Sequence, residues 1–181
     1  MFEFLWKRKK QATQEVAREP AKTATPAESG VAAGTRLHYD PNLVPNLVSD
    51  HRMLLGIFGE ITAAMEQKNM IRTKEKLGEF GDALRGHLLK ENVRFYVYLQ
   101  HSLEGDAENS AIMDEFRREM QHIGKAVADF LHKYTAEDEW DGRMWQSFQQ
   151  EAGGIGKVLT KRIDTEENSL YPLYLPQQDY R

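Results

Sequence analysis

Five ionisable residues occupy positions where the helices of this sequence would otherwise present apolar side chains: His51, His87, Glu91, Arg162 and Glu166. His87 and Glu91 are four residues apart, and Arg162 and Glu166 repeat that spacing. Four residues advance an α-helix by one turn plus about 40°, so both members of a pair face the same way. Burial of an unpaired charge costs several kcal/mol, so these side chains need partners of opposite charge or a metal ion. Histidine and glutamate at this spacing inside a helix bundle are typical of di-iron carboxylate sites.

The elements that must position these residues are four helices. The hydrophobic periodicity predicts them at about 43–67, 71–101, 109–135 and 139–172. Asp40 followed by Pro41 favours a helix start, because a capping side chain and an early proline both suit a first turn. The links at Gln67–Met70 and Glu104–Asp106 are short, so consecutive helices should be antiparallel neighbours. The sequence therefore predicts an all-α fold, an antiparallel up-down-up-down four-helix bundle over residues 37–181.

The phase of the third helix distinguishes two of its residues. Its apolar side chains centre on Met120, whereas His122 lies about 200° away around the helix axis. We therefore expect Met120 to face the core and His122 to face solvent. The same reasoning places His51 at the centre of the apolar stripe of the first helix.

The bulk composition limits the classes of function. Hydrophobic residues make up 40% of the 181 residues, enough for one sizeable core, and the net charge of −4 gives no reason to expect nucleic-acid binding. The chain has no cysteine, which excludes disulfides, thiolate catalysis and sulfur-ligated metal sites. A small helical chain without disulfides fits the cytoplasm, where we expect this protein. No separate nucleophile or substrate pocket is indicated, so we favour a non-enzymatic role, and the sequence names no protein partner.

Residues 1–36 differ in composition from the rest of the chain. Met1–Lys10 places apolar residues ahead of the basic run KRKK, the reverse of the order in a secretory signal. This head could make weak contact with a membrane surface, and a solubilising end is the simpler interpretation. Residues 11–36 contain no aromatic residue and only two large aliphatics, both valine. We therefore expect a flexible, disordered tail ahead of the bundle.

Four short motifs mark the start of the bundle and three of its predicted helices. They are Tyr39-Asp40-Pro41, Leu47-Val48-Ser49-Asp50-His51, His87-Leu-Leu-Lys-Glu91, and the run from Arg162 to Pro172 that contains Glu166-Glu167 and Leu170-Tyr171. Together they resemble the hemerythrin-like (HHE cation-binding) family across residues 38–175. In the last motif the family shows His-xxx-Glu-Glu-xx-Leu-Tyr-Pro. The resemblance implies a bundle that binds two non-haem irons bridged by carboxylates.

By this resemblance, the metal ligands of the chain are His51, His87, Glu91 and Glu166, and the set is smaller than that of the family. Arg162 stands where the histidine of the fourth helix is expected, and an arginine has no free lone pair for a metal. By phase, Met120 occupies the position of the family's histidine on the third helix, and its soft thioether matches iron poorly.

Two functions stay open for this reduced ligand set. In the first, the protein binds or senses a metal centre, non-haem iron, with one or two ions. In the second, it is a metal-free regulatory or interaction bundle in which Arg162 replaces the metal charge between Glu91 and Glu166.

Removal of residues 1–36 should leave the fold intact, because their composition cannot bury enough apolar surface to offset the entropy of ordering them. A truncated protein that begins at Leu37 should keep the helical circular dichroism and the melting temperature of the full chain. A melting temperature lowered by more than a few degrees would show that the tail packs on the bundle.

Overall fold

Four long helical segments make up the described part of the chain, residues 37–180 of a computed structural model. The first is α1 (Leu43–Glu66), and the third is α4 (Ala107–Ala136). The second begins as α2 (Met70–Lys90), continues through a π-helical segment, η2 (Glu91–Phe95), and ends as α3 (Tyr96–Ser102). The fourth begins as α5 (Gly142–Thr165) and continues through a second π-helical segment, η3 (Glu166–Leu170), and the 3₁₀ turns η4 (Tyr171–Leu173) and η5 (Gln177–Asp179).

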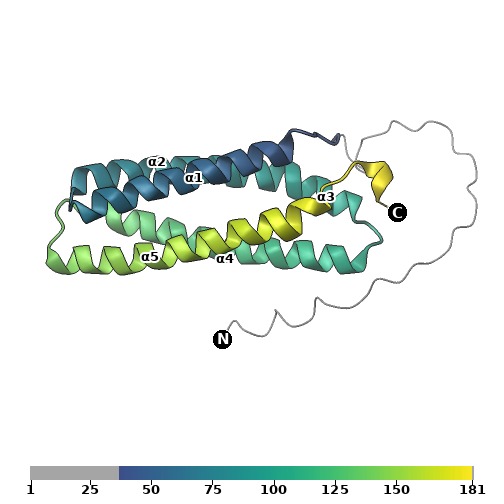
Figure 1. The fold of residues 1–181 in the computed structure, drawn as a ribbon. Helices are drawn as coiled ribbons and strands as arrows, with labels where there is room; N and C mark the ends of the chain where they lie inside the picture. The colour runs from purple at the N-terminus through teal and green to yellow at the C-terminus, as the bar shows by residue number, and fades with distance from the viewer. Residues whose placement is uncertain (1–36, 181) are drawn as a thin grey trace, which may run out of the picture.

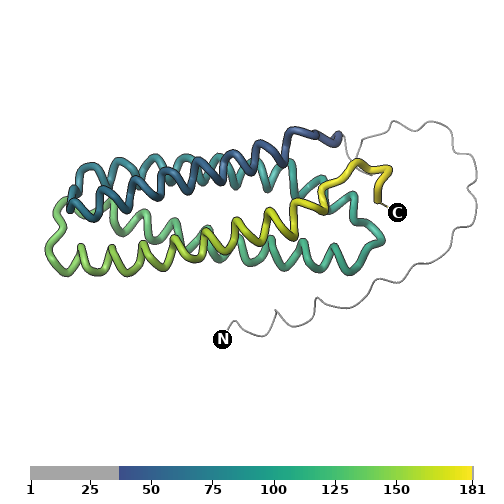
Figure 2. The backbone as a smooth tube through the Cα atoms, in the orientation of Figure 1, coloured from purple at the N-terminus to yellow at the C-terminus, as the bar shows by residue number. Residues whose placement is uncertain are grey.

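Consecutive long helices run antiparallel and form one elongated bundle (Figures 1 and 2). α1 packs on α2 and α5, and α4 packs on the same two helices. The predicted all-α, up-down-up-down four-helix bundle is therefore confirmed, with helix limits that differ from the predicted ones by a few residues at most. The expected tail over residues 1–36 and its membrane-contacting head lie outside the described residues. Within residues 37–180, every helix is too short or too polar to cross a membrane.

Capping side chains in the sequence fix the start of three helices. Asn69, Asp106 and Asp141 each accept a hydrogen bond from the backbone N–H three residues further along the chain. Such a bond satisfies a donor that a helix start leaves unpaired, and it is worth about 1 kcal/mol. Because the caps determine where each helix begins, they also determine which residues of neighbouring helices meet at the same depth of the bundle.

The buried apolar side chains form two clusters, one toward each end of the bundle. Along α1, Leu47 belongs to one cluster and Leu54 to the other, with the buried His51 between them. The second and fourth helices repeat this pattern, from Leu84 to Phe95 and from Leu159 to Leu170. A polar layer therefore divides the core of the bundle.

Each π-helical segment begins at an inward-facing glutamate of this polar layer. The carbonyl of Glu91 accepts a hydrogen bond from the N–H of Tyr96, and the carbonyl of Glu166 accepts one from Tyr171. On a regular α-helix, a residue five positions further on points about 140° away. The wider π turn reduces that angle, so that both tyrosines are buried on the same side as their glutamates. Hydrophobic periodicity alone did not predict these two segments.

Gly156 allows α5 to approach α1 closely, which leads to a prediction about stability. A Cβ atom at this position would lie 2.7 Å from Cε1 of Phe58, well inside van der Waals contact. Gly156→Ala should therefore lower the free energy of unfolding by about 1–2 kcal/mol, in spite of the better helix propensity of alanine.

The matched control is Gly153, one turn earlier on α5, where an added Cβ would meet no atom within 4 Å. Gly153→Ala should raise the free energy of unfolding by about 0.5–1 kcal/mol, since only backbone entropy changes. Urea denaturation of both variants measures the difference. If Gly156→Ala is as stable as Gly153→Ala, the contact with Phe58 does not limit the packing of the two helices.

Candidate metal centre

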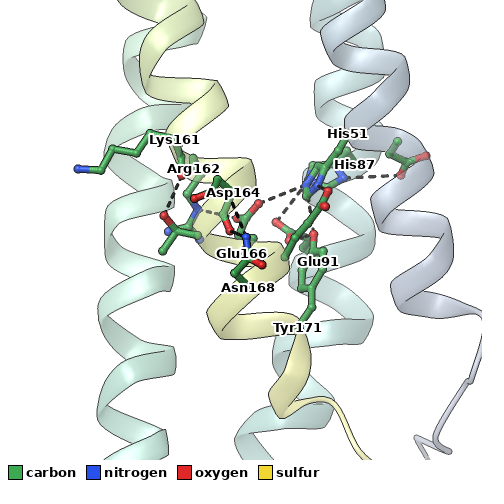
Figure 3. Close-up of polar contacts among 12 residues, drawn as sticks. His51, His87, Glu91, Lys161, Arg162, Asp164, Glu166, Asn168 and Tyr171 are labelled. Carbon is green, nitrogen blue, oxygen red and sulfur yellow. Dashed lines mark hydrogen bonds and ion pairs between the residues drawn. The ribbon is translucent and has the colours of Figure 1, made fainter. Parts of the chain in front are cut away.

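The five ionisable residues of the sequence pattern meet in the polar layer, where each is no more than 4% exposed. They come from three helical segments: His51 from α1, His87 and Glu91 from the second, and Arg162 and Glu166 from the fourth. In Figure 3 the two histidines point from one side toward the carboxylates, and Arg162 approaches Glu166 from the other. The structure thus brings together residues that are separated by as much as 115 positions in the sequence.

His51 is held at both ring nitrogens. Its Nδ1 lies 2.8 Å from Oε1 of Glu167, and its Nε2 lies 3.2 Å from Oε2 of Glu166. The hydroxyl of Tyr171 is also 3.2 Å from Nε2. Burial lowers the pKa of His51, but the hydrogen bonds to Glu166 and Glu167 outweigh it and leave the pKa above its ordinary value. His51 therefore carries a proton more readily than a free histidine does.

His87 stands beside His51, with the two ring centres 4.7 Å apart. Its Nδ1 is 3.6 Å from Oδ2 of Asp50, and its Nε2 is 3.7 Å from Oε2 of Glu91. Burial and the nearby charge of His51 lower the pKa of His87 to about 4, so this ring is neutral near pH 7. Both histidines direct Nδ1 toward a carboxylate and Nε2 toward the interior, the arrangement that orients imidazoles as metal ligands.

Glu91 is fully buried and has no cation in direct contact among residues 37–180. Its Oε1 accepts a hydrogen bond of 2.9 Å from the hydroxyl of Tyr171, whereas its Oε2 has no hydrogen-bond partner among the described residues. Burial, and then the negative charge of Glu166, raise the pKa of Glu91 to about 8. Near pH 7 this carboxyl group is therefore protonated in the metal-free protein.

Arg162 forms three hydrogen bonds that extend away from Glu91. Its Nε donates to Oε1 of Glu166 at 2.6 Å, its Nη1 to Glu119 at 3.1 Å, and its Nη2 to the hydroxyl of Tyr96 at 3.1 Å. The guanidinium also lies over the ring of Phe116. The expectation that Arg162 bridges Glu91 and Glu166 was wrong, because its other two bonds reach Glu119 on α4 and Tyr96 on α3, and Glu91 is bonded by Tyr171 instead. Only Glu166 is kept ionised: burial would raise its pKa, but His51 and Arg162 lower it.

Three of the predicted ligands offer nitrogen or oxygen atoms that all lie within 4.8 Å of one another: His51, His87 and Glu166. Around a transition-metal ion with bonds of about 2.1 Å, ligand atoms lie at most about 4.2 Å apart, so small side-chain movements would complete a coordination sphere. Glu91 stands next to this group with its unpartnered Oε2. The donor chemistry therefore fits a metal ion: two imidazoles and a carboxylate, a combination found at non-haem Fe(II) sites.

A small cavity of about 30 Å³ adjoins the three side chains. Apart from the site residues, apolar side chains line most of it, including Leu54, Phe80 and Met120. This volume is sufficient for one water-sized molecule beside the polar layer. Met120 is thus buried at the site, as the helical phase predicted, whereas His122 is exposed and stands apart from it.

Helical phase did not identify the residues that hold the site from outside. Glu167 directly follows Glu166, and Asp50 directly precedes His51. The carboxylate of Glu167 faces His51, and that of Asp50 faces His87. The sequence offered one signal for Glu167 and Asp50, which is that each is adjacent in the chain to a predicted ligand. Tyr96 and Tyr171 lie five residues after a site glutamate, a spacing that becomes meaningful only once the π turns are known.

Comparison with known proteins assigns this arrangement to a family. A family model described as "Hemerythrin HHE cation binding domain" matches residues 42–174. This range contains all five residues of the polar layer and confirms the resemblance that the sequence motifs indicated over residues 38–175. Neither the search of curated proteins nor that of solved structures gave a match.

The raised pKa of Glu91 predicts a pH-dependent stability of the metal-free protein. The native state keeps this proton up to about pH 8, whereas the ordinary pKa of a glutamate is 4.5. Between these values the unfolded state binds fewer protons than the native state, so the free energy of unfolding should fall as the pH rises toward 8. Glu91→Gln cannot ionise, so at about pH 7–8 it should exceed the parent in stability by on the order of 2 kcal/mol.

Urea denaturation with a chelator present, at about pH 5, 7 and 8, measures this difference. The gap between the two proteins should be small at the lowest pH and widen as the pH rises. A gap that stays constant over the three conditions would mean that Glu91 does not titrate in this window.

Proposed function

The chain belongs to the hemerythrin HHE cation-binding domain family, and we propose that it is a non-enzymatic binding or sensing protein for a non-haem iron centre with a reduced ligand set. The ligands in this proposal are His51, His87, Glu91 and Glu166. Arg162 and Met120 stand at positions where the family resemblance calls for histidine. A cytoplasmic location, which the cysteine-free composition favours, is part of the same proposal.

The observation that carries the proposal is the convergence of His51, His87 and Glu166 in a buried layer, with ligand atoms within 4.8 Å. Side chains of this kind are rarely buried without a specific compensating partner. Glu91 Oε2 is a buried atom without a hydrogen bond among the described residues, which is the condition expected of a group that a metal would complete. Imidazole nitrogen and carboxylate oxygen together suit iron better than sulfur-preferring ions.

A binding or sensing role is favoured over catalysis by the size of the adjoining cavity. A cavity of about 30 Å³ suits a small ligand such as water or a diatomic molecule, and it is far smaller than the usual pocket for an organic substrate. The chemistry that bound iron would supply here is coordination of such a small ligand at a position open to the cavity. The chain's own residues would hold the ion and exclude bulk water.

A metal-free regulatory bundle is the second candidate, and one observation favours it. Arg162, Glu166 and His51 already form a compensated chain of charges, at 2.6 Å and 3.2 Å. Such a network can be stable without a metal ion, since each buried charge has a partner. In that case the bundle would serve as a scaffold for a partner that the described residues do not identify.

Metal analysis of the full chain separates the two candidates. Protein purified without metal-affinity resin and supplied anaerobically with Fe(II) should retain iron through gel filtration. At about 100 times the dissociation constant, iron should raise the free energy of unfolding by about 2.7 kcal/mol. His51→Ala and His87→Ala should abolish both effects, whereas the control His122→Ala, an exposed histidine on α4, should behave like the parent. A parent protein that stays metal-free and gains no stability would rule out the first candidate and leave the second.

A further inference from the structure

The two helical segments that carry the carboxylates repeat one pattern. His87 is followed by Glu91 and Tyr96 at spacings of four and five residues, and Arg162 is followed by Glu166 and Tyr171 at the same spacings. In both segments, the five-residue interval is a π turn closed by a hydrogen bond from the tyrosine N–H to the glutamate carbonyl. The second and fourth segments are therefore two versions of one local structure, which differ at their first position.

The tyrosine of each segment also forms a hydrogen bond with a polar residue of the other segment. Tyr171 of the fourth segment donates to Glu91 of the second, at 2.9 Å. In the other direction, Tyr96 accepts a hydrogen bond of 3.1 Å from Arg162. The site is thus built from two facing halves. Each half also includes a residue from the helix that precedes its segment in the chain. α1 contributes His51 beside His87, and α4 contributes Met120 to the same cavity as Arg162.

Glu166 connects the two halves through its two oxygens. Its Oε2 faces His51 Nε2 at 3.2 Å, and its Oε1 receives the Nε–H of Arg162 at 2.6 Å. A carboxylate that bridges two metal ions likewise directs one oxygen to each cation. Here the cation on the Oε1 side is the guanidinium, which is always protonated and has no lone pair for a metal.

From these contacts we propose that the site binds one divalent transition-metal ion, in the half formed by His51 and His87, and that Arg162 is a permanent cation in the place of a second ion. The ion is held by the two Nε2 atoms and Glu166 Oε2, with Glu91 Oε2 as the adjacent oxygen. This inference rests on the proposed function, because it concerns the number of ions and not whether any ion binds.

Two properties of the second half exclude a further ion. The guanidinium is buried at 4% exposure and held by three hydrogen bonds, to Glu166, Glu119 and Tyr96, so it already occupies the Oε1 side of Glu166. A divalent ion at Glu166 Oε1 would have to share that oxygen with the guanidinium and would be repelled by it at short range. Met120 offers only a thioether on that side, a poor donor for an ion that prefers nitrogen and oxygen.

Titration of the metal-free full chain with Co(II) tests the proposal. The visible absorption of bound Co(II) should rise to a sharp end point at one equivalent, and electron paramagnetic resonance should show an isolated high-spin ion. An end point at two equivalents, with the loss of signal expected of two carboxylate-bridged ions, would overturn the proposal and leave the proposed function intact. No binding at all would overturn both.

A double variant tests the role of Arg162 directly. Arg162→His with Met120→His places an imidazole at each deficient position of the second half, so the end point should move from one to two equivalents and the two ions should couple. Arg118→His is the matched control, since it makes the same kind of replacement at an exposed position of α4 and should keep the end point at one. If the folded double variant still binds one ion, Arg162 does not occupy the place of the second. If the double variant does not fold, the Co(II) end point of the parent protein alone tests whether the site binds one ion or two.

Discussion

The ionised carboxylate of Glu166 is the group on which the rest of the polar layer depends. It is 1% exposed, and a carboxylate at that depth can stay charged only with cations in contact. Arg162 lies on one oxygen and His51 on the other, and together they lower the pKa of Glu166 against the effect of burial. Glu91 has no such cation, so its pKa is raised to about 8. The layer thus keeps one inner carboxylate charged and the other neutral, because His51 and Arg162 are both in contact with Glu166 and neither is paired with Glu91.

The helix caps and the packing of the apolar core hold the residues of the polar layer in place. The caps at Asn69, Asp106 and Asp141 fix the helix starts, and an apolar cluster packs the bundle on each side of the polar layer. The π turns then bring a tyrosine next to each carboxylate, and one of these, Tyr171, supplies the hydrogen bond of the neutral Glu91. π turns inside α-helices are frequently associated with functional sites. Here they add a donor and an acceptor to the layer without adding another helix.

This construction separates the tasks of the two halves of the site. The half with His51 and His87 has nitrogen donors, each with its outer ring nitrogen near a carboxylate. The half with Arg162 and Met120 has a fixed positive charge and an apolar side chain. The arginine supplies this positive charge without a metal ion and at any physiological pH, because its guanidinium stays protonated. The small cavity beside both halves, lined largely by apolar side chains, suits small ligands such as water or a diatomic molecule.

The sequence by itself determined the fold and the identity of the inward-facing polar residues. Hydrophobic periodicity, short links and capping residues act locally, so they could be read along the chain: the four helices, the burial of Met120 and the exposure of His122 all followed from phase. The partners of those residues were decided only by the tertiary structure. Helical phase shows that Arg162 points into the bundle, but it does not show which residues its long side chain contacts. The guanidinium bonds Glu119 and Tyr96 and does not bond Glu91. The positions of Tyr96 and Tyr171 also depended on tertiary packing, because a π turn has no clear signature in hydrophobic periodicity and arises where neighbouring helices stabilise it.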